Sequence, residues 1–333
     1  MKKVISQTLL FAVILVFVSG FEFMFGVNNT QVGITVIIAI LVFLQEDLTK
    51  TPVKNLFKLL SINLISGVFT YLSASNMWLG LILNFVTLSF IGYLFSFRMT
   101  KTMVVPFGLQ YLFLLYSPVS GIDFQNRLVG LGVGAVLIMV VQLIVHGKKD
   151  KKKKTTQFVP IDKEESEYKV TTVFGIAVKY HKVRAEFALK IGLLTALSAF
   201  IVAYFQLQQG RWIVYTIFSL TELYSEQFNI RSKQRLQGTM IGAAAILVLF
   251  ILAKGMAMRT VIILIAGYLS GFTNNYRDNM IFVTISAVAS TALMNGTFQT
   301  IMERIIYVLV GILLAIVVDK FLFTKKGIQQ NIL

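Results

Sequence analysis

One short apolar stretch, residues 212–221, is bordered by side chains that can bind an anion and exchange a proton. Arginine binds a carboxylate through paired, charge-assisted hydrogen bonds, and a carboxyl group shielded from water can take up a proton. A basic loop follows the stretch and would attract an anion to its mouth. The candidate substrate-binding residues are Arg211, Trp212, Glu222, Arg231 and Arg235, together with Arg277 further along the chain.

These charges stand out because a helix that only contacts lipid needs none of them. A charged side chain near the middle of a bilayer costs about 2.5–3.5 kcal/mol on insertion scales, so it usually faces the protein interior or water. Arg211 and Glu222 therefore predict a polar path through the protein. The alternative is that they lie at opposite membrane interfaces, where long side chains reach the headgroups. The sequence leaves both interpretations open.

The residues that follow Arg235 are small and regularly spaced. Gly238 and Gly242 are four residues apart, and three alanines come directly after Gly242. This spacing predicts a helix whose backbone approaches a neighbouring helix closely. We therefore assign Gly238, Thr239 and Gly242 a structural role.

The first half of the chain repeats this arrangement when the sequence is shifted by 177 residues. Each half holds one unusually short apolar segment, 32–44 in the first and 212–221 in the second. In transporters, short segments at corresponding positions are the best sequence indication of the substrate site. Gln45 and Lys58 therefore join the candidate substrate-binding residues, and a duplication without a transport role is the alternative. The aligned pairs include Gln45 with Glu222, Lys58 with Arg235, and Arg127 with Arg304.

The composition predicts an integral membrane protein. Of the 333 residues 56% are hydrophobic and only 14% are charged, compared with about 25% charged in soluble domains. The chain has no cysteine and two histidines, and it has no phosphate-binding loop and no catalytic constellation, so we expect no metal, no cofactor and no enzyme activity. The net charge of +16 lies mostly in loops, where it contacts anionic lipid headgroups rather than nucleic acid.

The apolar runs predict an all-α fold with about twelve transmembrane segments. A helix needs about 20 apolar residues to cross a bilayer. Ten runs approach that length, and the two short segments complete six in each half. Each half then has an even number of crossings, so the halves form two parallel six-helix repeats. The ten longer runs are 6–27, 56–73, 77–97, 103–120, 126–146, 185–205, 236–254, 257–273, 279–295 and 302–323.

The positions of lysine and arginine predict the orientation. Basic residues recur in the loops after every second segment, which assigns these loops and both termini to the cytoplasm of a multi-pass plasma-membrane protein. Lys254 and Arg259 are the exception. The charged stretch between the halves is interpreted as a solvated hinge, with a lipid-binding switch as the alternative. The predicted parts are a first membrane repeat (1–146), a basic cytoplasmic linker (147–183), a second membrane repeat (184–325) and a cytoplasmic tail (326–333).

The element that enters the segment after the basic loop resembles the fusaric acid resistance protein family, also called the aromatic acid exporter family. Its residues are Arg235-Leu236-Gln237-Gly238-Thr239-Met240-Ile241-Gly242, similar to the family's Arg-x-x-Gly-Thr-x-x-Gly. Phe187-Ala188-Leu189-Lys190 is similar to the family's Ala-Leu-Arg start, with lysine in place of arginine. The resemblance covers about 180–325, and the first half has Lys58 and Ser61 at the matching positions of the element.

The resemblance implies a six-helix module present twice, acting as an efflux permease for aromatic or amphipathic organic anions. An anion channel, or a lipid-handling or structural membrane protein, is the alternative. Proton coupling would use a shielded carboxyl group, with Glu222 the first candidate and Glu303 and Asp278 the others. The expected partners are a small organic anion and the bilayer with its anionic headgroups, and assembly into a homo-oligomer is left open.

Overall fold

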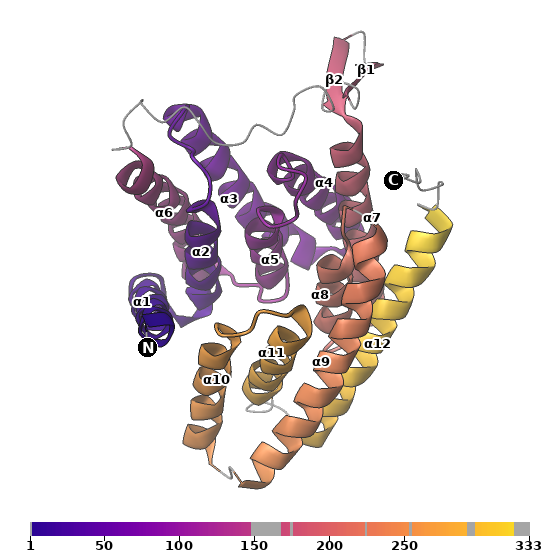
Figure 1. Cartoon of the computed structure of the whole chain (residues 1–333). Coiled ribbons are helices and arrows are strands. Elements are labelled where there is room, and N and C mark those ends of the chain that lie inside the picture. The colour runs from indigo at the N-terminus through magenta and orange to yellow at the C-terminus, as the bar shows by residue number, and fades with distance from the viewer. Residues whose placement is uncertain are drawn as a thin grey trace, which may run out of the picture. The chain divides into compact units, whose positions relative to one another are not determined.

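The computed structural model describes residues 2–147, 168–173, 176–223, 225–252, 255–291 and 297–322 (Figure 1). Within these ranges the chain forms twelve α-helices, one short 3-10 helix and one β-hairpin. The helices divide into two compact units. The first unit ends at Phe200 and the second begins at Ile201, so the boundary lies within a helix.

The first unit contains six complete helices, the hairpin and most of a seventh helix. Antiparallel pairing joins the two strands of the hairpin, with Tyr168 opposite His181. The elements are α1 (Lys2–Phe25), η1 (Val27–Asn29), α2 (Thr30–Phe43), α3 (Pro52–Ser75), α4 (Met77–Phe95), α5 (Val104–Leu115), α6 (Gly121–His146), β1 (Tyr168–Val173), β2 (Ile176–His181) and α7 (Lys182–Tyr204).

The second unit contains the end of α7 and five further helices. These are α8 (Arg211–Leu220), α9 (Ser225–Leu252), α10 (Met256–Ser270), α11 (Tyr276–Thr291) and α12 (Thr297–Leu322). In each unit the second helix, α2 or α8, is short, whereas in fourth place α4 has 19 residues and α10 has 15.

Seven of the described helices are long and apolar enough to cross a membrane, so the chain is a multi-pass membrane protein. They are α1, α3, α4, α6, α7, α9 and α12. Each of the twelve predicted segments corresponds to a helix. However, α5, α10 and α11 span only 12, 15 and 16 residues, which is shorter than the segments predicted at 103–120, 257–273 and 279–295.

The hairpin is a departure from the all-α prediction. It lies inside the stretch 147–183, where the sequence predicts only a polar linker. The strands are rich in β-branched and aromatic residues, which favour extended structure. The many charges that precede the strands predict a solvated linker, so the sequence does not predict the hairpin.

Local sequence determines where several helices of the first unit begin. Pro52 occupies the first turn of α3, where its missing N–H is not needed. Asn76 caps α4 by accepting hydrogen bonds from the backbone N–H groups of Trp78 and Leu79. Asn76 is therefore both the residue that follows α3 and the residue that caps α4. The two helices pack against each other.

Neutral polar side chains fill part of the interior of the first unit and are bonded to one another. Gln110 of α5 donates to Asn63 Oδ1 of α3 at 2.8 Å and accepts from Thr35 of α2 at 3.3 Å. Tyr111 donates to Asn84 Oδ1 of α4 at 2.7 Å. These bonds connect four helices through uncharged groups, so these buried polar atoms are satisfied without an ion pair.

One arginine is buried among these helices with a complete set of partners. Arg127 of α6 donates from Nε to Asn29 Oδ1 (2.9 Å), from Nη1 to the carbonyl of Ser117 (2.8 Å) and from Nη2 to the carbonyl of Asn28 (2.9 Å). Asn29 in turn donates to the carbonyl of Asp123. Arg127 therefore joins the loop before α2 to the loop before α6.

Most of α7 packs on α4 within the first unit. A Cβ at Gly92 would lie 2.9 Å from Ile191 Cγ2, and one at Gly192 would lie 2.9 Å from the carbonyl oxygen of Phe85. Arg184 also donates from Nη2 to the carbonyl of Tyr93 at 2.5 Å. Two glycines, one on each helix, thus let the backbones come close.

In the second unit α9 packs closely on α11 through the predicted small-residue element. A Cβ at Gly238 would lie 2.6 Å from both Arg277 O and Met280 Cβ, and one at Gly242 would lie 2.7 Å from Ile281 O. Thr239, between them, is buried. The close approach at Gly238 and Gly242 is therefore the helix contact that their spacing predicts.

Candidate anion-binding site

Four arginine side chains lie along α8 in the second unit, and we call them the arginine row: Arg211, Arg304, Arg235 and Arg231. Three of them contact successive positions of α8 and its end. The Arg304 guanidinium carbon lies 3.8 Å from the Trp212 ring centre, Arg235 Nε donates to Thr216 Oγ1 (3.2 Å), and Arg231 Nη1 pairs with Glu222 Oε1 (2.6 Å). Since Trp212, Thr216 and Ser219 are spaced i, i+4, i+7, they share one face of the helix.

The four arginines of the row belong to three helices, α8, α9 and α12 (Figure 1). Arg211 belongs to α8 itself, Arg231 and Arg235 come from α9, and Arg304 comes from α12. Gly311 lets α12 approach α8, because a Cβ there would lie 2.8 Å from Thr216 Cβ and 3.0 Å from the carbonyl of Ile213. At 1.5 Å per residue the ten residues of α8 extend about 15 Å, which is the approximate length of the row.

Arg235, in the middle of the row, is bonded to neutral groups. Its Nη1 donates to Ser219 Oγ (3.0 Å) and to the Tyr276 hydroxyl (2.9 Å) of α11, and these two hydroxyls are 2.7 Å apart. The side chain is buried, with 5% of its surface exposed. These bonds orient the guanidinium group, but they do not neutralise its charge.

Glu222 lies just beyond the end of α8 and pairs with Arg231 at one end of the row. The Glu222 side chain is 4% exposed and the Arg231 side chain is 38% exposed. The Arg231 guanidinium carbon also lies 5.3 Å from the centre of the Tyr276 ring. The negative end of the α8 helix dipole disfavours a carboxylate at this position. The positive charge of Arg231 offsets this repulsion.

Arg304 and Arg211 surround Trp212 at the other end of the row. Arg304 is 2% exposed, and none of the described residues accepts a hydrogen bond from its buried Nε and Nη1. Arg211 donates from Nη2 to Gln209 Oε1 at 3.0 Å, while its buried Nε has no acceptor within the same described ranges. Arg304 lies within electrostatic range of both Arg211 and Arg235, so like charges surround it.

The row as a whole carries excess positive charge. In the part of the chain that the structure describes, Glu222 is the one carboxylate paired with it, which leaves three of the four arginines without a countercharge. Taking charges out of water without a counterion is costly. The arrangement is chemically suited to receive an anion, through free N–H donors as well as through charge.

The other predicted binding residues lie apart from the row. Arg277 donates from Nε to its neighbour Asp278 at 2.9 Å near the start of α11, and both side chains are partly exposed. Glu303 is partly exposed and accepts a hydrogen bond from Gln299. Of the three carboxyl groups considered for proton uptake, Glu222 is therefore the buried one.

Gln45 and Lys58 belong to the first unit, and neither has the environment of its aligned partner. Lys58 Nζ lies 5.2 Å from the centre of the Phe95 ring. Gln45 is exposed, whereas the next residue, Glu46, is buried and pairs with Arg98 Nε at 2.6 Å. The buried carboxylate near the end of α2 is therefore Glu46, one residue after the predicted position.

Arg304 is not among the binding residues that the sequence predicts. Its alignment with Arg127 places an arginine inside an apolar segment of each half, which is a sequence signal for a functional charge. Tyr276 and Ser219 were also missed, because a hydroxyl carries no sequence signal of this kind.

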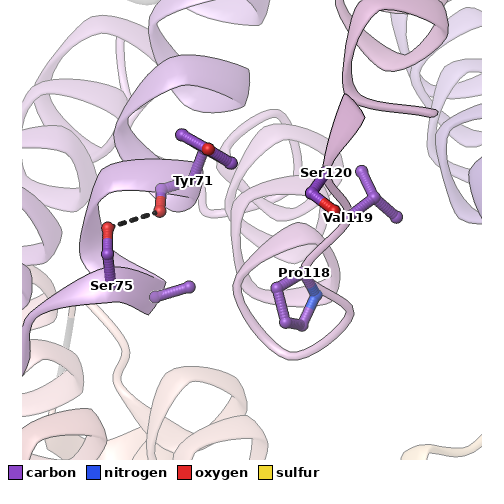
Figure 2. A pocket seen from close by; sticks show the side chains of 6 residues that line it. Tyr71, Ser75, Pro118, Val119 and Ser120 are labelled. Carbon is purple, nitrogen blue, oxygen red and sulfur yellow. Dashed lines mark hydrogen bonds between the residues drawn. The ribbon is translucent and has the colours of Figure 1, made fainter. Parts of the chain in front are cut away.

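A hollow of about 270 Å³ in the first unit offers different chemistry. It is lined by Tyr71, Ala74, Ser75, Pro118, Val119 and Ser120. Figure 2 shows the Ser75 hydroxyl bonded to the backbone carbonyl of Tyr71, and no charged side chain lines the hollow. It therefore lacks the groups that would hold a charged substrate. Across the described ranges no cluster of histidine, aspartate or glutamate is arranged to bind a metal ion.

Comparison with known families identifies the region that contains the arginine row. Residues 196–318 match the family model described as fusaric acid resistance protein-like. This region is similar to fusaric acid resistance proteins. The resemblance predicted from the Arg235–Gly242 element is confirmed, and the match includes all four arginines of the row.

The match to the fusaric acid resistance protein-like family supports a role in membrane transport, and it is consistent with the prediction that the chain is not an enzyme. No curated protein and no solved structure matches the chain.

Proposed function

We propose that this protein is a plasma-membrane efflux permease for aromatic or amphipathic organic anions. The observation that carries the proposal is the arginine row along α8, in which three charges have no carboxylate partner and several buried donors have no acceptor among the residues that the structure describes. An organic anion supplies the countercharge and acceptor atoms that these groups lack. Trp212 and Tyr276, which contact arginines of the row, provide flat apolar surfaces for the rest of such a molecule.

The transport path follows α8 in this proposal. An anion first meets Arg231, whose side chain is 38% exposed, and then passes Arg235 to reach Arg304 and Arg211. Because α8 is short, its ends lie within the protein and need polar surroundings, as in the discontinuous helices of many transporters.

Glu222 couples the path to protons. In its charged form it occupies Arg231 and competes with an incoming anion. When Glu222 takes a proton on its carboxylate it becomes neutral, so Arg231 is released to bind the substrate carboxylate. Return of the proton to water restores the pair and displaces the substrate. The proton and the anion therefore bind and leave together, and the outward gradient of the anion itself drives export.

We also propose that the two units are parallel six-helix repeats with twelve crossings in total. Corresponding helices pack in the same pairs: α2 with α6 and α8 with α12, and α3 with α5 and α9 with α11. The seven long helices do not by themselves establish the remaining crossings, so this part of the proposal depends on a topology measurement.

Flux in reconstituted vesicles tests the function. Purified full-length protein is placed in liposomes loaded with benzoate, and benzoate release is followed against empty liposomes. A permease gives release that saturates with benzoate concentration and responds to an imposed pH gradient. Release no faster than from empty liposomes, with folded protein present, would contradict the proposal.

An anion channel is the second candidate, and the continuous positive charge of the row favours it. A channel would conduct in near proportion to the electrochemical driving force without saturating in the same range. The same vesicles, clamped at different potentials, separate the two functions.

The proposed orientation places both termini and the linker in the cytoplasm. The chain has no cysteine, so single cysteines introduced at Lys151 and Gln329 can be labelled without background. Both positions should react with a membrane-impermeant reagent only after the cell is opened. Labelling of either one in intact cells would contradict the parallel repeat.

A further inference from the structure

The Arg304 guanidinium is placed where a structural arginine would be unfavourable. It is buried, it has like charges in Arg211 and Arg235 nearby, and its Nε and Nη1 have no acceptor among the described residues. The interaction with the Trp212 ring stabilises the cation. This stabilisation is smaller than the cost of moving an ion from water into a protein interior, so the ring alone does not offset that cost.

Arg127 shows that this sequence can supply partners to a buried arginine. All three of its nitrogens donate to oxygen atoms at 2.8–2.9 Å, from the loops before α2 and α6. Arg304 occupies the aligned position, and yet none of the described residues accepts from its Nε or Nη1. The lack of acceptors around Arg304 therefore does not follow from burial of an arginine at this aligned position.

We infer that Arg304, with Arg211 beside it, is the inner binding site for the carboxylate of the transported anion. This inference rests on the proposed transport function and adds to it the residue that holds the substrate. The carboxylate oxygens accept from Arg304 Nε or Nη1 and from Arg211 Nε, which are the donors left free. One negative charge is thereby matched to the pair of arginines around Trp212.

The ligand class follows from the donors. A planar carboxylate presents two oxygens to a guanidinium group, whereas a neutral amide presents one oxygen and adds donors that repel it. The half-buried Trp212 ring, with Tyr215 edge-on at 5.6 Å between ring centres, lies against the rest of the molecule. The site should therefore bind benzoate and discriminate against benzamide.

Thermal unfolding of the detergent-solubilised full-length protein tests the inference. A ligand that binds the folded state raises the unfolding temperature in a saturable manner. We expect benzoate to do so at constant ionic strength in sodium chloride, and benzamide not to. In Arg304→Gln the apparent affinity for benzoate should fall about 10- to 100-fold, as for the loss of charged hydrogen bonds.

Two control variants separate the site from general charge and from general stability. Arg259→Gln removes an arginine of the second unit that lies over Phe250, away from the row, and should bind benzoate as the wild type does. Arg127→Gln should unfold at a lower temperature but keep the benzoate-dependent rise. If Arg304→Gln does not fold, Arg304→Lys replaces it; this variant keeps the charge and should lose part of the affinity.

The result that overturns the inference is a benzoate affinity unchanged in the Arg304 variants, or an equal rise with benzamide. Benzoate flux in vesicles, measured in parallel, keeps the two proposals apart. Binding that requires Arg304 without any flux supports this site and contradicts the transport function. Flux that persists in Arg304→Gln with unchanged affinity supports transport and contradicts this site.

Discussion

Arg127 of the first unit and Arg304 of the second occupy aligned positions and are buried to the same degree, but their surroundings are opposite. Arg127 is hydrogen-bonded through every nitrogen to oxygens of two loops. Arg304 faces an aromatic ring and two like charges. A buried polar group stabilises a fold only when its partners are present. Arg127 joins two segments of the chain through its hydrogen bonds, whereas Nε and Nη1 of Arg304 have no acceptor among the described residues.

The same contrast extends to the rest of the two interiors. In the first unit Gln110, Asn63 and Tyr111 use neutral side chains bonded to one another. In the second unit the groups along α8 are cationic, with Glu222 as the paired carboxylate among the described residues. The interior of the first unit is therefore joined by bonded neutral side chains, whereas the second unit has a row of positive charges along α8.

The largest expected effect is on stability and separates the two arginines. Arg127→Gln should lower the free energy of unfolding by about 3–5 kcal/mol, because three buried oxygen acceptors lose a charged donor. Arg304→Gln should change it by less than about 1 kcal/mol, since an unpaired buried charge is removed. Thermal or denaturant unfolding of the purified protein without added anion measures both. Equal destabilisation by the two substitutions would remove the contrast.

The next effect concerns transport. Arg235→Gln should reduce benzoate flux about 10- to 100-fold, because the charge in the middle of the row is lost while a hydrogen-bonding side chain is kept. The aligned substitution Lys58→Gln, in the first unit, serves as the comparison and should reduce flux far less. Flux measurements in vesicles with matched protein content decide this. A greater loss for Lys58→Gln would place the path in the first unit.

Packing between α9 and α11 gives a smaller effect on stability. Gly238→Leu should destabilise by about 1–3 kcal/mol or more through overpacking against α11. Gly238→Ala should be milder but still unfavourable, because its Cβ would lie 2.6 Å from Arg277 O. Gly20→Ala in α1 is the matched control: nothing lies within 4 Å of its Cβ, so the change should be neutral or slightly stabilising. The three unfolding temperatures would rank differently if α9 and α11 were not in contact.

The smallest expected effect is on pH dependence, and it compares two buried glutamates. Glu222, paired with Arg231, is the buried carboxylate proposed to exchange a proton. Glu222→Gln removes both its charge and the exchangeable proton, so the flux of this variant should depend on pH much less than wild-type flux does. Glu46→Gln, which removes the corresponding partner of Arg98 in the first unit, should leave the pH profile unchanged. A flux series over several pH values tests both, and an unaltered profile in Glu222→Gln would return this residue to a structural role.

Much of the architecture could be predicted from the sequence. The order of the segments, the two short helices and the close approach at Gly238 and Gly242 follow from hydropathy and residue size, which act locally along the chain. The lengths of α5, α10 and α11 were overestimated, because an apolar run does not show where the backbone turns. The β-hairpin was missed next to a highly charged stretch.

The site was predicted less completely, for a physical reason. Arg235 and Glu222 stood out by their charge next to an apolar segment, and both lie at α8. The role of Arg304 depends on which oxygens are absent around it, and this is a property of tertiary packing rather than of sequence. The shift by 177 residues aligns Gln45 with Glu222, so it does not indicate Glu46, the next residue and the buried partner of Arg98.

The boundary between the units, inside α7, has a consequence for biosynthesis. The contacts of α7 with α4 at Gly92 and Gly192 belong to the first unit, although α7 is made after the long charged stretch. The first unit therefore cannot complete its packing when α6 leaves the ribosome, and must wait until α7 has been inserted. A chain that stops before Lys182 would leave the small-residue face of α4 open to lipid or to quality-control proteases.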